Sequence, residues 1–246
     1  MNSERFTVGL GAALVGALGL VLASWIGGAA FIKGKRSDQT IVVTGSARKR
    51  IRSDLVIWKA GVSFQATALA DAYRSLAAEV PRVKSYLIGK GVPENQITIS
   101  SIAFQTLHAK SNEGGGDQGA ISGYSLRQEL EVRSTDVDKI AQIAREATEL
   151  INQGILIESM PPEYHYTKLG DLKIEMLAEA AKDAKERAKQ IANSTGSSIG
   201  SLRSARMGVL QITHADSNAV SGEGVNDTSS LEKDITAVVN ISFAVD

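Results

Sequence analysis

The most constraining feature of the chain is a long stretch without charge near its N-terminus. From Thr7 to Ile32, 26 consecutive residues carry no charged side chain. A helix of that length rises about 39 Å, which exceeds the roughly 30 Å thickness of the hydrocarbon core of a bilayer. The sequence therefore predicts a short tail at 1–6, a single transmembrane anchor at 7–32, a linker at 33–39 and a globular domain at 40–246.

A cleaved signal peptide is the competing interpretation of this stretch. Signal peptides have apolar cores of about 7 to 15 residues. Here the apolar core continues to Ile32, just before the cations of 33–36, so an uncleaved anchor is favoured. The positive-inside rule compares these three cations with Arg5 on the other side of the anchor. Taken alone, that comparison places the domain in the cytoplasm.

The composition of the domain excludes several classes of function. Without Glu4 and Arg5 the chain keeps 26 basic and 26 acidic residues, so nucleic-acid binding has no electrostatic basis. The short basic run at 48–52 is interpreted as a solvated turn between two strands. The chain has no cysteine, which excludes disulfides, thiolate metal sites and cysteine nucleophiles.

The hydrophobic period of the domain switches repeatedly between 2 and 3.6 residues, which predicts an α+β fold of strands and packed helices. The expected strands cover Ile41–Thr44, Val56–Phe64, Ile97–Lys110, Tyr124–Val132, Ile155–Thr167, Ser201–His214 and Ile235–Val245. The expected helices cover Ala68–Gly89 with a kink at Pro81, then Ser134–Ile151 with a cap at Ser134 or Thr135, and Leu172–Asn193. A polar loop is expected at 215–230.

Two of these helices have a continuous apolar stripe that predicts which residues are buried. In the first helix the stripe consists of Leu69, Tyr73, Leu76, Val80, Val83 and Leu87. In the third helix it is the row Leu172, Met176, Ala180, Ala184, Ala188 and Ala192. Because alanine is small, the third helix is expected to approach its neighbour closely.

The alternation in the strand expected at 97–110 changes phase between Ile99 and Ile102. A bulge near Ser100 and Ser101 restores a single apolar face. The partner strand follows the glycine-rich segment 111–119, which is predicted to be a flexible hairpin loop. A phosphate-binding loop is disfavoured because no Lys and Ser/Thr helix start follows the glycines.

Candidate catalytic residues are few. The three histidines, His108, His165 and His214, have no second histidine at ligand spacing. Alternation places Glu163 and His165 on one face of a strand, and such a pair across a groove can transfer protons or hold a metal. The favoured interpretation is a polar strand face. Glu175 and Glu179 are assigned to an exposed helix face, so no catalytic, cofactor-binding or metal-binding residue is predicted.

Four segments together resemble the SIMPL-domain family of bacterial periplasmic proteins, some of them linked to oxidative stress. They are IVVTGSARKRIRSDLVIWKAGVSF, ADAYRSLAAEVPRVKSYLIGKGVPENQITISSIAF, ISGYSLRQELEVRSTDVDKIAQI and MLAEAAKDAKERAKQIANSTGSSIGSL. The most specific words are V-x-G at Val43–Gly45, Gly91-Val92, Gly123-Tyr124 and the alanine repeat from Ala178 to Ala188.

The resemblance implies antiparallel strands with helices packed over them, export to the bacterial envelope and, in some relatives, a ring-like homo-oligomer. It supplies no catalytic residues. Together with the anchor, it predicts a non-enzymatic, single-pass inner-membrane protein with its domain in the periplasm, although the positive-inside comparison disagrees. We expect its partners to be further copies of itself and the bilayer, and its role to lie in envelope integrity or stress response. The alternatives are a ligand-binding module or enzyme with a cleft near Glu163 and His165, and a cytoplasmic adaptor.

Overall fold

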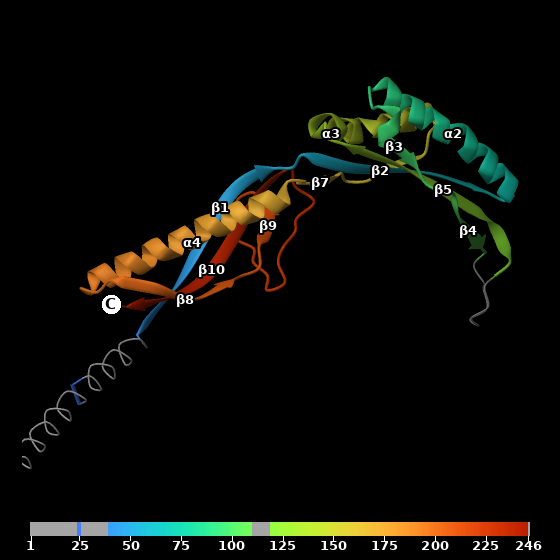
Figure 1. The fold of residues 1–246 in the computed structure, drawn as a ribbon. Helices are drawn as coiled ribbons and strands as arrows, with labels where there is room; N and C mark the ends of the chain where they lie inside the picture. The colour runs from blue at the N-terminus through green and yellow to red at the C-terminus, as the bar shows by residue number, and fades with distance from the viewer. Residues whose placement is uncertain (1–23, 26–38, 110–118, 246) are drawn as a thin grey trace, which may run out of the picture. The chain divides into compact units, whose positions relative to one another are not determined.

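A computed structural model of the chain describes residues 24–25, 39–109 and 119–245 (Figure 1). The predicted anchor, apart from residues 24–25, and most of the predicted loop at 111–119 lie outside these ranges. Within them, no helix is both long enough and apolar enough to cross a membrane. The described chain divides into two compact units, the first formed by residues up to Arg48, Lys173–Leu210 and residues from Thr236, the second by Lys49–Leu172 and Gln211–Ile235.

The described elements confirm a mixed α+β fold with antiparallel sheets. The strands are β1 (Thr40–Arg52), β2 (Leu55–Ala66), β3 (Ile97–Ile99), β4 (Ala103–His108), β5 (Ile121–Ser134), β6 (Ile157–Ser159), β7 (Glu163–His165), β8 (Ile199–Met207), β9 (Gln211–His214) and β10 (Glu232–Val245). The helices are α2 (Leu69–Gly89), α3 (Val137–Glu146) and α4 (Leu169–Ser194), with short 3₁₀ helices η1 (Glu94–Gln96) and η2 (Ala147–Gln153).

The first unit consists of α4 packed on strands in the order β1-β10-β8 (Figure 1). The predicted alanine row is confirmed, because all six of its residues are buried. Gly45 on β1 lies directly beneath this row, so close that a Cβ atom there would lie 2.6 Å from the Ala184 Cβ atom. The backbone N–H of Ser46 donates to Asp183 on the same helix at 2.8 Å. Small residues on both sides therefore allow the helix to lie against the strand.

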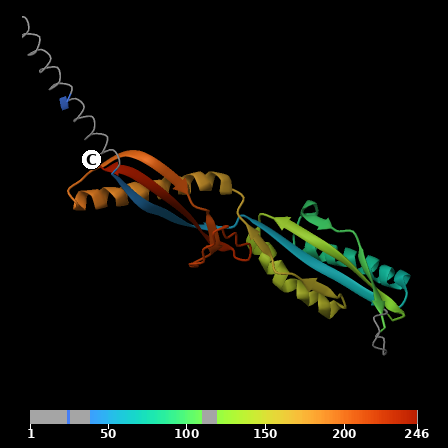
Figure 2. The same ribbon diagram turned by 90° about the horizontal axis from the view of Figure 1, so that it is seen from below.

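The second unit is a sheet with both helices α2 and α3 on one face (Figures 1 and 2). The central strands β2 and β5 pair from Val56–Ser134 to Ala66–Tyr124. Strands β3 and β4 pair with the outer side of β5, and β6 and β7 with the outer side of β2. The core lies between the sheet and the helices and includes Val56, Trp58, Val62, Leu76, Val83, Leu87, Leu130 and Ile140.

The predicted bulge on the outer side of β5 is confirmed. Ile99 pairs with Leu130 and Ala103 pairs with Arg127, so the outer strand advances by four residues while β5 advances by three. At the bulge, the backbone N–H of Ser100 donates to the Glu129 carbonyl at 2.9 Å, so this strand stays hydrogen-bonded to β5. Beyond the bulge, Phe104 pairs with the buried Leu126 and therefore lies on the helix side of the sheet.

A hydrogen-bonded relay connects the fully buried Trp58 to helix α3. The Trp58 indole N–H donates to the Ser159 hydroxyl at 3.1 Å, and that hydroxyl donates to the Ala144 carbonyl at 2.7 Å. We expect Ser159→Ala to lower the free energy of unfolding by about 1–3 kcal/mol, because it leaves buried polar groups without partners. Urea unfolding followed by Trp fluorescence measures this loss. An unchanged midpoint contradicts the relay, and Ser63→Ala on the helix-free face of the sheet is the control.

The basic run was predicted to form a turn, and this prediction is wrong, because β1 continues to Arg52. The guanidinium groups are held by carboxylates far away in the sequence. Arg50 contacts the buried Asp234 at 2.7 Å and Asp216 at 2.6 Å. These hydrogen bonds, to Asp234 first, raise the pKa of Arg50 above its ordinary value. Arg52 contacts Asp138 at 2.6 Å.

Other expected elements also differ in the structure. The strand expected at 155–167 is divided into β6 and β7, because Pro161 and Pro162 cannot donate to a sheet ladder. The strand expected at 201–214 is divided into β8 and β9. The second helix begins at Val137 with Asp136 as its cap, one or two residues after the expected cap, because Ser134 pairs with Val56 in the sheet and Asp136 accepts from the Lys139 N–H. That helix continues as η2 and ends at Gly154, whose φ of 81° suits glycine.

Candidate functional site

The pair Glu163 and His165 lies on β7, on the face of the sheet opposite the helices. Tyr164 between them packs against the core, so the predicted alternation is confirmed. The His165 Nε2 and Glu163 Oε2 atoms are 3.5 Å apart, and about one third of His165 and half of Glu163 are exposed. Both side chains project from one strand. They form a polar strand face, and neither lines the two grooves described below.

Several other charged side chains on this helix-free face are paired with one another. Arg127 contacts Glu158 at 2.5 Å and Glu129 at 3.3 Å. The hydrogen bond to Glu158 is the main cause of the raised pKa of Arg127. Lys59 lies 3.7 Å from Glu131 on the neighbouring strand. In the part of the chain that the structure describes, no group of three or more His, Asp or Glu side chains is arranged to hold a metal ion.

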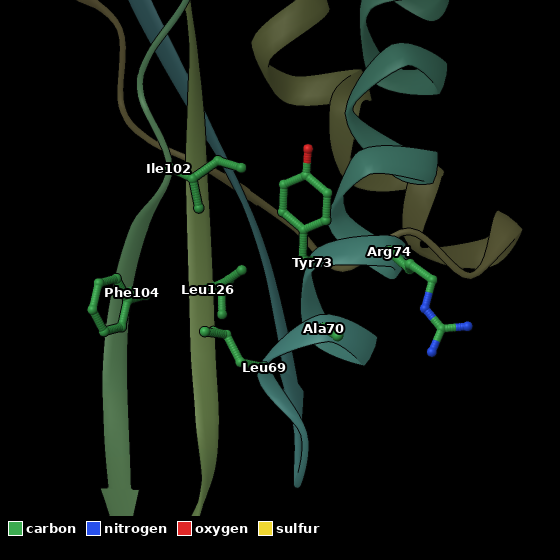
Figure 3. A pocket seen from close by; sticks show the side chains of 7 residues that line it. All are labelled: Leu69, Ala70, Tyr73, Arg74, Ile102, Phe104 and Leu126. Atoms are coloured by element: carbon green, nitrogen blue, oxygen red, sulfur yellow. The ribbon is translucent and has the colours of Figure 1, made fainter.

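An apolar groove of about 660 Å³ lies on the other face, between α2 and β4 (Figure 3). Its lining residues are Leu69, Ala70, Tyr73, Arg74, Ile102, Phe104 and Leu126. Leu69 is 43% exposed, Tyr73 53% and Phe104 66%. The prediction that Leu69 and Tyr73 belong to the core is therefore wrong. Helix α2 packs mainly on β2 and β5, so its flank beside β4 borders an open groove.

The chemistry of the groove favours contact with an apolar surface. Its one charged lining residue, Arg74, is paired with Asp71 one helical turn earlier. Tyr73 supplies the only other side-chain polar group in the lining. The lining therefore has no paired nucleophile and base for catalysis. Burying its exposed apolar side chains against a partner would lower the free energy. Exposed apolar patches of this kind mark interaction sites.

A second groove of about 480 Å³ lies between α2 and η2, lined by Pro81, Arg82, Ser85, Tyr86, Leu150, Gln153 and Ile155. The Tyr86 hydroxyl is buried without a hydrogen-bond partner. Burial is the main cause of its raised pKa. Lys90 lies 5.4 Å from the centre of the Tyr86 ring and contacts Glu146 at 2.7 Å. The contact of Lys90 with Glu146 connects the C-terminal end of α2 with α3.

The family comparison covers most of the chain. The model of the SIMPL family, described as proteins of unknown function (DUF541), matches residues 41–243. The chain belongs to the SIMPL family. No curated protein matches the sequence significantly. Within this SIMPL protein, Gly45 of the V-x-G motif at 43–45 packs against Ala184 of the alanine repeat in α4. Close packing of the helix on the strand therefore explains both motifs.

Proposed function

We propose that this SIMPL protein is a non-enzymatic, membrane-anchored protein of the bacterial envelope that assembles with itself into a homo-oligomer. Residues 7–32 anchor it in the inner membrane and its domain lies in the periplasm. Its role is in envelope integrity or stress response. The observation that carries self-assembly is the exposed apolar groove beside α2, where Leu69, Tyr73 and Phe104 are open to solvent in the single chain.

Two features support this proposal beyond the groove. The charge-free stretch at 7–32 is long enough to cross a bilayer, and SIMPL membership carries the expectation of an envelope protein. On the helix-free face of the second unit, Lys59 pairs with Glu131 on the neighbouring strand, and Arg127 pairs with Glu158 across β2. These pairs make that face polar, so the apolar groove on the helix side is the surface that favours a contact.

The mass of the full-length protein in detergent tests this function. Light scattering is expected to give a discrete assembly for the full chain and for a version that begins at Ser37. A monomer in both samples contradicts self-assembly. Assembly of the full chain alone places the contacts in the anchor, where small residues recur at four-residue spacing in pairs such as Ala12/Gly16. Circular dichroism of the shortened version shows whether it is folded.

Alanine at both Glu163 and His165 is expected to leave the assembly unchanged. The two side chains are partly exposed and the contact between them is 3.5 Å long, so the free energy of unfolding should change by no more than about 0.5 kcal/mol. Light scattering and urea unfolding of the double variant provide the check. Loss of the assembly with the fold intact would instead place a functional site on this pair.

A further inference from the structure

The edge formed by β4 differs from the outer strands β1, β6, β7 and β8. Natural proteins protect strand edges with charged residues, prolines or covering elements, because unpaired backbone groups recruit further strands. Strand β8 carries Arg203 and Arg206, β1 carries the basic run at 48–52, and β6 and β7 carry two glutamates and flank a pair of prolines. From Ile97 to Ala109 there is no charged residue and no proline.

Within the described residues, β4 pairs with β5 on one side, and its other side has no neighbouring strand. The same strand supplies Phe104 to the apolar groove, and this side chain is 66% exposed. An unprotected strand edge therefore lies next to an apolar surface. These two features favour a partner that pairs a strand with β4 and at the same time covers the groove.

We propose that β4 pairs antiparallel with β4 of a second copy of this chain, so that the two sheets continue into each other. This inference rests on the proposed self-assembly and locates one of its contacts. Charge compatibility favours a second copy as the partner. Pairing β4 with any of the charged exposed strands named above brings a charge to an uncharged seam, whereas a second β4 brings only Ala103, Phe104, Gln105, Thr106, Leu107 and His108.

The geometry of an antiparallel pair limits the possible registers. Directly opposite residues lie on the same face of a sheet, so the two-fold axis must pass at a residue and not between two residues. The registers that use most of β4 place the axis at Gln105 or Thr106. With the axis at Gln105, Phe104 of each copy lies opposite Thr106 of the other, on the helix side. The two grooves then form one apolar surface across the seam.

Single cysteines test this register in the full-length protein in detergent, because the natural chain has none. Only a residue near the axis meets its own copy, and disulfides require Cα atoms within about 7 Å. We expect Gln105→Cys or Thr106→Cys to form crosslinked dimers at least about tenfold faster than Ala103→Cys, whose copies are separated by roughly 14 Å or more along the strand. Ala78→Cys, on the exposed surface of α2, is the second control.

A charge at the seam provides an independent measurement. Thr106→Lys should weaken self-association at least about tenfold, because it brings two like charges together across the seam. Ala78→Lys adds the same charge to the surface of α2 and should leave the association unchanged. Both are measured by light scattering over a concentration series, with circular dichroism to confirm folding.

The outcomes separate this inference from the proposed function. An assembly of unchanged mass in Thr106→Lys, together with uniform crosslinking along β4, overturns the β4 contact and leaves self-assembly standing elsewhere. A wild-type protein that is monomeric at every concentration overturns both. In that case β4 remains an open edge for an extended segment of another protein.

Discussion

Gly45→Ala is expected to lower the free energy of unfolding by about 3 kcal/mol or more, at the upper end of what overpacking usually costs. The new Cβ atom would lie 2.6 Å from the Ala184 Cβ atom and closer still to the Ala180 carbonyl oxygen and the Ala184 nitrogen. Two of these three atoms belong to the helix backbone. The clash cannot be relieved by a change of rotamer, so α4 must move away from β1.

Hydrogen exchange locates this effect. Gly45→Ala should lose protection in the amides of α4, while α2 in the other unit keeps its protection. Gly89→Ala is the matched control, because nothing lies within 4 Å of a Cβ atom there and alanine is the better helix former. We expect its stability to stay the same or to rise by up to about 1 kcal/mol. Normal protection of α4 in Gly45→Ala would contradict the close packing.

Asp227→Ala is expected to lower the free energy of unfolding by about 3–5 kcal/mol, because it leaves a buried cation without its counter-charge. Lys233 is 1% exposed, and its Nζ atom contacts the Asp227 backbone carbonyl and lies 3.5 Å from the carboxylate. The carboxylate also accepts from the Ser229 N–H at 3.0 Å and the Ser229 hydroxyl at 2.6 Å. Loss of Asp227 therefore also releases the segment before β10.

Lys233→Met separates the charge from the packing. Methionine has a similar volume and carries no charge, and replacing a buried lysine in this way should cost less than about 1.5 kcal/mol or increase stability. Guanidinium unfolding of both variants measures the difference. Equal losses in the two variants would mean that the ion pair itself is the stabilising element and would contradict the expected asymmetry.

The pH dependence of this pair has a defined sign. Burial opposes the ionised form of Asp227, but hydrogen bonds from Ser229 and Ser230 and the charge of Lys233 outweigh it and hold its pKa below the ordinary value. Its contribution to stability is therefore present above about pH 3.9 and is lost as the pH falls below that value. In Asp227→Ala, the free energy of unfolding should therefore fall less steeply than in the wild type as the pH is lowered below this value.

The lysine adds a second rise of stability with pH, at high pH. Burial lowers the pKa of Lys233 and Asp227 only partly offsets this. Between its folded pKa and about 10.4 the unfolded chain binds the proton more tightly, so stability rises with pH in that range. Lys233→Met should remove this rise. The measurement is a series of denaturant midpoints from neutral pH to about pH 10.4.

Local sequence patterns determined much of this fold. The row from Leu172 to Ala192 is buried along its whole length, because helical spacing by itself places those residues on one face. The phase change between Ile99 and Ile102 located the bulge, because a period of two leaves no other way to keep one apolar face. The strand polarity of Glu163, Tyr164 and His165 followed from the same alternation.

The tertiary structure decided the local conformation and burial of residues whose neighbours are distant in the sequence. Arg50 continues a strand because Asp216 and Asp234 come close to it. Leu69 and Tyr73 share the spacing of Leu76, yet they are exposed because α2 packs on β2 and β5 and its flank beside β4 is left open. Periodicity shows which face of an element is apolar. Whether a neighbour covers that face depends on how the sheet is ordered, which no local pattern contains.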